Sequence, residues 1–246
     1  MELTVLGTQS PYSLPDHHCP GFLVRHGDAK LMLDCGSGTH SALSMPDDLN
    51  GLGIVISHMH LDHCSDIGSI QYASYVFHEH GRLSAPVDIW VPRRPEARNV
   101  VVNEPIAYAT YHGIDEGTAF DFHGLHVDFC RTDHFMECYA TRVSDGRATV
   151  VYTGDLAFSC HGRIAEFSHG ADLLVCESSL LDSYGLPESK GHLTAKQAAT
   201  IAREAGVKRL LLTHFWPEED TERYADEARP VFGNVSIASE GMTVIV

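Results

Sequence analysis

The sequence has no long apolar run, and this absence excludes one class of protein. None of its 246 residues lies in an uninterrupted apolar stretch of about 18 residues or more, which is what a membrane-spanning helix needs. The first residues, MELTVLGT, carry an acid and no basic cluster, so they do not resemble a secretory signal. We therefore expect a cytoplasmic protein that begins with a strand and has no membrane partner.

The sequence also lacks any C-x-x-C pair. Its seven cysteines are odd in number and loosely spaced, which argues against a zinc knuckle and against a disulfide framework. Reduced thiols in an intracellular protein are the simplest interpretation.

Basic residues are scarce, because 17 Lys and Arg stand against 33 Asp and Glu, for a formal net charge of −16. Proteins that bind nucleic acid over a broad surface usually present a basic field. The one candidate for a local basic patch is VPRRPEAR (residues 91–98), which either touches a substrate phosphate or forms a solvated loop.

No linker, repeat or long charge block divides the chain, so we expect one domain over residues 1–246. The hydrophobic content of 43% is enough for a full core. Short apolar runs bounded by turn residues predict strands in the front half, and strands alternate with helices in the back half. The main expected elements are a helix at 66–80, hairpins at 118–134 and 139–155, strands at 171–178 and 208–214, and helices at 194–206 and 221–230. This alternation predicts a layered α/β sandwich.

Histidine is abundant, with 17 residues, and four metal-binding side chains crowd into ISHMHLDHCSD (residues 56–66). They are His58, His60, Asp62 and His63. Residues two apart in an extended segment point the same way, so His58 and His60 can grip one metal ion together. Asp62 and His63, a step further round the turn, can reach a second. Imidazole nitrogen and carboxylate oxygen suit zinc, and also manganese or iron.

Three further candidate ligands each follow an apolar run that we expect to be a strand. They are His134, Asp155 and His214. In layered α/β folds, sites gather at strand ends, where loops carry polar groups on a rigid base. His134 would complete the first metal site and His214 the second. Asp155 would bridge two metals roughly 3.5–4 Å apart, which would lower the pKa of a water between them.

These motifs resemble those of the metallo-β-lactamase superfamily. SHMHLDH matches its H-x-H-x-D-H motif, and RTDH, YTGD and LLLTHF match the later ligand motifs in the expected order, over nearly the whole chain. The resemblance implies a four-layer αββα sandwich with a binuclear site at one edge of the sheets. The two divalent ions would be Zn²⁺, with Mn²⁺ or Fe²⁺ as alternatives. The resemblance also disfavours antibiotic hydrolysis, because the true β-lactamases lack the bridging acid found here as Asp155.

The later segment GHLTAKQAATIAREAGVKRLLLTHFWP resembles the tRNase Z and related phosphodiesterase branch. His192 takes the position of an extra histidine that the branch places before a helix. The branch pairs it with the acid of a His-Glu-Ala-Thr segment, and CESS keeps that acid as Glu177, with Cys176 and Ser178 replacing the His and the Ala. The resemblance implies that His192 stabilises charge on the phosphate or protonates the leaving oxygen, and that Glu177 orients it. Asp62 would steer the attacking hydroxide.

Two of these assignments keep a structural alternative. His192 could instead cap or support the following helix, although Thr194 is a credible N-cap by itself. Asp34, in LDCGSG, either accepts a hydrogen bond from a ligand histidine or makes a turn before the glycines.

Two features separate this chain from tRNase Z itself. That family inserts a tRNA-gripping arm between the third histidine motif and the bridging acid, whereas only a hairpin fits between His134 and Asp155. The net negative charge of the chain also argues against a large RNA substrate. We therefore expect a binuclear phosphodiesterase that acts on a small phosphodiester, for which a cyclic phosphodiester is one candidate. The alternatives are a tRNA 3′-processing endonuclease, a lactone or thioester hydrolase, and a non-catalytic metal-binding protein. Dimers are common in this branch, so a homodimer is compatible with it.

Overall fold

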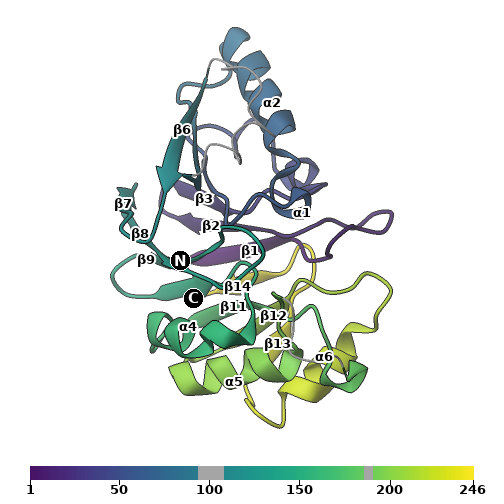
Figure 1. The fold of residues 1–246 in the computed structure, drawn as a ribbon. Coiled ribbons are helices and arrows are strands. Elements are labelled where there is room, and N and C mark those ends of the chain that lie inside the picture. The colour runs from purple at the N-terminus through teal and green to yellow at the C-terminus, as the bar shows by residue number, and fades with distance from the viewer. Residues whose placement is uncertain (94–107, 186–190) are drawn as a thin grey trace.

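Two sheets packed face to face make up the body of the protein. The computed structural model describes residues 1–93, 108–185 and 191–246. Within these residues, the first sheet has the strand order β14-β1-β2-β3-β4-β5-β6 and the second has the order β13-β12-β11-β10-β9-β8-β7. Figure 1 shows helix α2 on the outer side of the first sheet and α4, α5 and α6 on the outer side of the second. This arrangement confirms the predicted four-layer αββα sandwich.

The bounds of the elements follow. The first sheet contains β1 (Glu2–Gly7), β2 (Gly21–His26), β3 (Ala29–Leu33), β4 (Gly53–Val55), β5 (Val87–Pro92), β6 (Ala109–Ile114) and β14 (Thr243–Ile245). The second contains β7 (Ala119–Phe122), β8 (Leu125–Arg131), β9 (Tyr139–Ser144), β10 (Thr149–Tyr152), β11 (Leu173–Glu177), β12 (Leu210–Thr213) and β13 (Val235–Ile237). The α-helices are α1 (Leu61–Cys64), α2 (Ile67–Glu79), α4 (His161–Phe167), α5 (Ala195–Ala205) and α6 (Thr221–Ala228). Short 3₁₀ turns are η1 (Thr39–Ala42), η2 (Phe158–Cys160) and η3 (Asp182–Tyr184).

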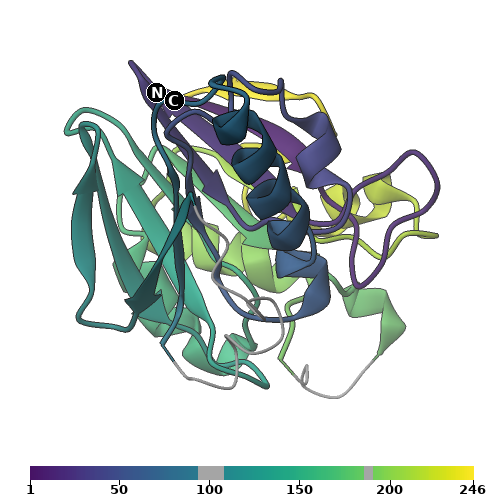
Figure 2. The ribbon, with the colours of Figure 1, turned by 90° about the horizontal axis from the view of Figure 1, so that it is seen from above.

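Alternation along the strands explains why the first sheet is covered on both faces. In β2, Phe22 and Val24 join the core between the two sheets, whereas Leu23 joins a separate core beneath α2. Successive side chains of a strand point to opposite faces, so both faces of a strand this apolar need cover. Ile67 and Ile70 of α2 supply that cover, and Figure 2 shows the helix lying across the sheet.

The ends of the chain lie together at the edge of the first sheet. Strand β14 pairs antiparallel with β1, with Leu3 opposite Val244, and the backbone N–H of Val246 donates to the carbonyl of Met1. Figure 2 shows the two termini side by side. Within the residues that the structure describes, no helix combines the length and the apolar character needed to cross a membrane.

Helix α5 begins and ends where its sequence predicts. Thr194 caps it, because its side chain accepts a hydrogen bond from the backbone N–H of Gln197 while the Gln197 side chain accepts one from the N–H of Thr194. Such a cap contributes about 1 kcal/mol to stability. The helix ends at Gly206 in the left-handed conformation, with φ of 63°. Since Thr194 makes the cap, His192 is not needed for it.

Strand direction brings the candidate site residues to one edge. Strands β10, β11 and β12 run parallel, and β8 runs the same way because β9 is antiparallel to both β8 and β10. The carboxyl ends of these four strands therefore share an edge, and the parallel strands β3 and β4 of the first sheet end beside it. A hydrogen bond of 3.0 Å from the N–H of Tyr139 to the carbonyl of Ser57 ties the two sheets together there.

Candidate metal centre

The candidate ligands lie in the loops and the short helix that follow the strand ends, and four of them, His58, His134, Asp155 and His214, come one to three residues after a strand. Strand β4 stops at Val55, so His58 and His60 lie in the loop that leads into α1, and Asp62 and His63 lie on that short helix. His134 follows β8, Asp155 follows β10 and His214 follows β12 directly. The sheet edge is therefore the rigid base, and the loops carry the polar groups.

Three histidines and one carboxylate form the first group. Nδ1 of His60 lies 2.8 Å from Nε2 of His58 and 3.2 Å from Nε2 of His134. The Oδ2 atom of Asp155 lies 3.6 Å from Nε2 of His58 and 3.8 Å from Nε2 of His134. Ligand atoms around a tetrahedral zinc ion with bonds of about 2.05 Å are about 3.3 Å apart. The four atoms are spaced as ligands of one ion would be.

Asp62, His63 and His214 form the second group. The Nε2 atoms of His63 and His214 lie 3.1 Å apart. Oδ2 of Asp62 lies 3.5 Å from Nε2 of His63 and 3.6 Å from Nε2 of His214. The Oδ1 atom of Asp155 lies 3.5 Å from Nε2 of His63 and 3.2 Å from Nε2 of His214. Ligand atoms within 4.8 Å of one another form three groups among the described residues: the two above, and a third that consists of Asp155, His192 and His214.

Asp155 stands between the two groups, because its Oδ2 faces the first and its Oδ1 faces the second. Its Oδ1 atom is buried and accepts no hydrogen bond from the described residues. A buried carboxylate oxygen without a partner is costly, and a bound cation would satisfy it. The donor set of imidazole nitrogens and carboxylate oxygens suits a divalent metal ion, so the residues fit the group that the motifs imply.

Partners outside the centre fix the orientation of four of the rings. His63 donates from Nδ1 to Asp34 (2.6 Å), and His134 donates from Nδ1 to the Gly191 carbonyl (2.8 Å). The other two rings contact serine hydroxyls through Nδ1: His58 contacts Ser57 (3.0 Å) and His214 contacts Ser179 (2.6 Å). Because each hydroxyl donates its own proton to a carboxylate, it accepts the hydrogen bond from the ring. Each ring thus donates from Nδ1 and turns its Nε2 to the centre, the nitrogen that binds a metal once it carries no proton.

The backbone around the centre holds uncommon conformations. Asp34 and His214 adopt positive φ values of 58° and 66°, a region that costs a side-chain-bearing residue about 1–3 kcal/mol. Gly191, with φ of 97°, leaves no room for a side chain, because a Cβ there would meet the ring of Phe135 at 2.9 Å and Nδ1 of His134 at 3.1 Å. Such strain concentrates at functional sites, where the surrounding structure maintains it.

Charge is distributed unequally between the two groups. In the first group, burial lowers the pKa of His58, His60 and His134, and neighbouring imidazoles lower it further. In the second, burial also disfavours the charged form of His63 and His214, but the carboxylates around them outweigh it. The pKa of His63 is raised, and that of His214 is raised to about 10, with Asp155 as the main cause in both.

His192 and Glu177 lie beside the centre and contact each other. Nδ1 of His192 is 3.1 Å from Oε1 of Glu177 and 3.7 Å from Oδ2 of Asp155. Glu177 is 1% exposed, and the N–H of Leu156 donates to its Oε1 (2.9 Å), so the carboxylate is held in place. Burial lowers the pKa of His192, but the charge of Glu177 and the hydrogen bond to it prevail, and the pKa is raised overall. The pairing that the motif comparison implied is present.

Several supporting residues carried no signal in the sequence. Ser10 donates to Oδ2 of Asp62 (2.7 Å), and Tyr152 donates to Oδ2 of Asp34 (2.6 Å) across the two sheets. Ser179 lies in the CESS segment, where the position had no assigned role. Its hydroxyl donates to Oε2 of Glu177 (2.7 Å) and links that acid to His214. Lone serines and tyrosines are common, and only the fold shows which of them meet the ligands.

Two sequence expectations outside the ligand set can be placed. Asp34 accepts hydrogen bonds from His63 and Ser57, so the supporting role predicted for it is confirmed, and its positive φ makes the turn as well. The basic segment 91–98 lies outside the described residues from position 94 onward. Arg93, within them, is 3.4 Å from Asp115.

Comparisons with known proteins agree with this geometry. A family model described as "Beta-lactamase superfamily domain" matches residues 30–215. The chain is 33% identical over 249 residues to the probable metallo-hydrolase YhfI of Bacillus subtilis (strain 168), with 98% of both chains covered. The crystal structure of YhfI matches with a TM-score of 0.89 at 29% identity, over 99% of both chains.

Two more distant proteins extend the comparison. A ribonuclease Z of Chlamydia trachomatis serovar L2 is 26% identical, over 97% of this chain and 95% of that one. A diphosphatase from the PhnP family has the same fold, with a TM-score of 0.77 at 18% identity over 100% of this chain and 97% of that one.

Proposed function

The chain belongs to the beta-lactamase superfamily of metal-dependent hydrolases, and on that basis we propose that it is a two-metal phosphodiesterase acting on a small phosphodiester. The observation that carries the proposal is the His192–Glu177 pair beside Asp155. A thioester expels a thiolate, which is stable enough to leave without protonation. A phosphodiester gains negative charge in the transition state and expels an alkoxide, so it benefits from a cationic donor at that position.

Two divalent ions, zinc in the simplest case, would be held by the groups described above. His58, His60 and His134 would hold one, Asp62, His63 and His214 the other, and Asp155 both. When bound, the ions would lower the pKa of water and neutralise charge on the phosphate oxygens. The protein's own contribution is orientation, because hydrogen bonds from Nδ1 of four of the imidazoles turn their Nε2 atoms toward the centre.

His192 is the residue that we assign to the leaving group. Burial opposes the charge on its ring, but the charge of Glu177 and the hydrogen bond to it raise the pKa of His192, which favours the protonated ring. Because Nδ1 is occupied by Glu177, the proton available for transfer is the one on Nε2. Glu177 accepts the Nδ1–H bond and balances the charge of the imidazolium before transfer. After transfer, water returns the proton to the ring, which is 29% exposed.

Asp62 is the residue that we assign to the attacking water. Its carboxylate contacts both His63 and His214 at the second group, and Ser10 holds one of its oxygens through a hydrogen bond of 2.7 Å. The charges and hydrogen bonds of the two histidines keep the pKa of Asp62 far below its ordinary value, even though burial opposes this. An ionised Asp62 can therefore accept a hydrogen bond from water and set its direction.

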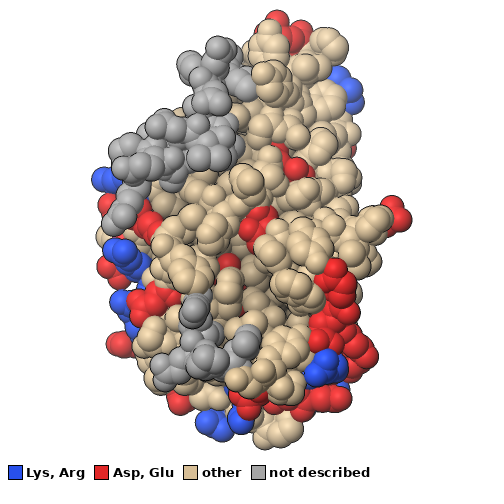
Figure 3. All heavy atoms as spheres, turned by 45° about the vertical axis from the view of Figure 1, so that its right-hand side comes forward, with Lys and Arg blue, Asp and Glu red and all other residues tan. Residues whose placement is uncertain are grey.

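A large RNA substrate fits this chain less well. Between His134 and Asp155 the structure has only the hairpin of β9 and β10, whose connection spans residues 145–148. Figure 3 shows a face on which Asp and Glu are spread while Lys and Arg lie toward the margins. A net charge of −16 repels a polyanion. The similarity to the Chlamydia ribonuclease Z keeps a tRNA-processing activity as the second candidate.

A substrate panel on the metal-loaded protein tests the proposal. It contains bis(p-nitrophenyl) phosphate, a cyclic nucleotide, a precursor tRNA, a lactone and a thioester. We expect turnover of the small phosphodiesters and no salt-sensitive binding of tRNA. Cleavage of the precursor tRNA at its 3′ side would favour the second candidate, and turnover of only the lactone or thioester would overturn the proposal.

A matched pair of variants locates the catalytic contribution of His192. His192→Gln should lower kcat on the cyclic nucleotide, which expels an alkoxide, by about 10²–10³, the usual contribution of a general acid, with the metal content unchanged. His126→Gln is the control, because His126 is an exposed histidine that pairs with Asp121 on the β7–β8 hairpin. Equal rates for both variants would remove His192 from the mechanism.

A further inference from the structure

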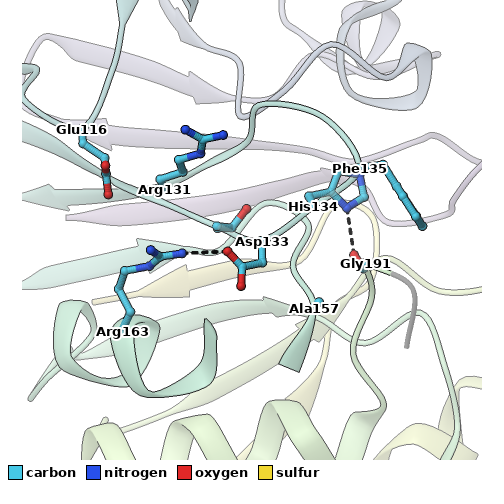
Figure 4. A pocket seen from close by; sticks show the side chains of 9 residues that line it. Glu116, Arg131, Asp133, His134, Phe135, Ala157, Arg163 and Gly191 are labelled. Atoms are coloured by element: carbon cyan, nitrogen blue, oxygen red, sulfur yellow. Dashed lines mark hydrogen bonds and ion pairs between the residues drawn. The ribbon is translucent and has the colours of Figure 1, made fainter. Parts of the chain in front are cut away.

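A cavity of about 740 Å³ opens beside the first metal group. His134 lies on its wall, and the remainder comes from the loop after β6, from the end of β8 and from helix α4. Figure 4 shows Glu116, Arg131 and Arg163 on one side of the cavity and His134 and Phe135 on the other. A volume of this size holds a small organic ligand. None of the roles assigned above uses this cavity apart from His134.

The two arginines of the cavity differ in their pairing. Arg163 is 3.0 Å from Oδ1 of Asp133, and Ser159 donates to the other oxygen of that acid (2.8 Å), so this cation is neutralised. Arg131 is exposed and, within residues 1–93, 108–185 and 191–246, has no ion pair or hydrogen bond from its side chain. In a chain with 33 acids and 17 basic residues, a cation that lines a cavity without a carboxylate partner is available to an anion.

Arg131 is also close to the reacting centre. It precedes His134 by three residues, so the two Cα atoms lie within about 11 Å of each other, the span of three extended residues. The long side chain of Arg131 can extend its guanidinium well beyond its own Cα atom. The guanidinium can therefore meet a group joined to the reacting phosphorus through one sugar.

Phe135 adds an apolar surface on the same side of the cavity as His134, across from Arg131 (Figure 4). Its ring is 67% exposed, and its centroid lies 5.4 Å from that of His134. The ring is held from behind, because it packs against Gly191, where no side chain would fit. An exposed, immobilised aromatic ring is the platform on which proteins stack a nucleobase.

We propose that this cavity is a substrate subsite in which Arg131 binds a second phosphate and Phe135 stacks the base of the same nucleotide. The inference rests on the proposed phosphodiesterase function and deepens it. The substrate class is a nucleotide phosphodiester that carries another phosphate one sugar away, such as a short linear dinucleotide. A cyclic mononucleotide has a single phosphate and would leave Arg131 unused.

Two chromogenic esters test the subsite directly. They are the p-nitrophenyl ester of thymidine 5′-phosphate and the same ester with an added 3′-phosphate. We expect the metal-loaded protein to favour the 3′-phosphorylated ester by about tenfold in kcat/KM, because a charge-assisted contact to phosphate contributes that much. The preference should shrink as salt is raised from 20 to 500 mM, since the contact is partly exposed.

Four variants show whether the preference depends on Arg131. Arg131→Gln should reduce the ratio of the two kcat/KM values to within about twofold of one, and Arg131→Lys should retain most of it. Glu116→Gln, which removes the opposing charge from the cavity, should raise the ratio about two- to threefold. Arg147→Gln is the control, because Arg147 is an exposed arginine in the β9–β10 connection, at the far end of these strands from the centre. It should leave the ratio unchanged.

These measurements distinguish failure of the Arg131 subsite from failure of the proposed phosphodiesterase activity. A preference that is absent in the wild-type protein, or that survives in Arg131→Gln, overturns the subsite while the phosphodiesterase activity stands. The thermal unfolding midpoint and metal content of Arg131→Gln should match the wild type, which an exposed substitution allows. If neither ester nor bis(p-nitrophenyl) phosphate is hydrolysed, the proposed function fails and the subsite with it.

Discussion

The two halves of the metal centre use similar ligands in different surroundings. In the first half, His58 and the side chain of His134 are 0% exposed and only His60 is partly exposed, and His134 lies on the wall of the cavity that contains Arg131. His63 and His214, in the second half, are 0% and 3% exposed and lie among carboxylates. Burial lowers the pKa of the histidines in the first half, whereas Asp155 and its neighbours raise it in the second.

This difference indicates a division of labour. The second half concentrates negative charge from Asp34, Asp62 and Asp155 around two imidazoles, so it should hold a cation more tightly. The first half is open to the cavity and should exchange its ion more readily. We expect substrate to approach from the first half, with the second half anchoring the centre.

The largest effect should come from Asp155, because it belongs to both halves. Asp155→Ala should lower kcat/KM on bis(p-nitrophenyl) phosphate by at least about 10³ and deplete metal from both groups. Turnover and metal analysis on the same sample check this. Asp226→Ala is the control, since Asp226 is a surface acid of α6 with 77% of its side chain exposed. Full turnover in Asp155→Ala would show that the two halves do not form one centre.

Metal release separates the halves from each other. During titration of the wild-type protein with a chelator, metal should leave in two steps. His60→Asn should abolish the weaker step and His214→Asn the tighter one, because each removes a ligand from one half. A single step in the wild type, or loss of the same step in both variants, would contradict the difference in affinity.

Removing the support of the second half should have a smaller effect. Asp34 accepts bonds from His63, Ser57 and Tyr152, so Asp34→Asn should weaken metal affinity by about 10–100-fold. Asp48→Asn is a matched control, because Asp48 is also a buried acid of this layer but pairs with Arg25 at 3.0 Å, away from the ligands. Both variants should lose stability in thermal unfolding. Equal metal affinities for the two would remove the supporting role of Asp34.

The smallest expected effect concerns Ser10. Its hydroxyl holds Asp62, so Ser10→Ala should reduce kcat by about three- to tenfold, the loss of one hydrogen bond to a charged group, without changing the metal content. Ser41→Ala, which removes an exposed hydroxyl bonded to the Gly38 carbonyl, should have no effect on kcat. Metal loss in Ser10→Ala would mean that the serine supports binding rather than the position of water.

The candidate ligands could be selected from the sequence because their signals are local. His58, His60, Asp62 and His63 lie within six positions, and each later ligand follows an apolar run whose length identifies a strand. The division into two groups also agrees with the geometry. Strand β4 ends at Val55, three residues before His58, because the chain must leave the sheet for the histidines to turn toward the centre.

Other parts could not be predicted, and the reasons are physical. Tyr152 and Asp34 are 118 positions apart, and their contact depends on how the two sheets pack. Strand β6 is mostly half-buried and lacks a clear alternation of apolar residues, and α4 is a seven-residue helix that contains a glycine. Neither segment has the periodic pattern of apolar residues from which a strand or a helix is predicted. Arg131 was unremarkable in the sequence because a lone exposed arginine has meaning only beside a cavity.

An anomalous-diffraction map of the metal-loaded crystal tests the central claim most directly. We expect two metal peaks on opposite sides of the Asp155 carboxylate, about 3.5–4 Å apart. One should lie among His58, His60 and His134, and the other should lie among Asp62, His63 and His214. A single peak, or two peaks that do not share Asp155, would contradict it.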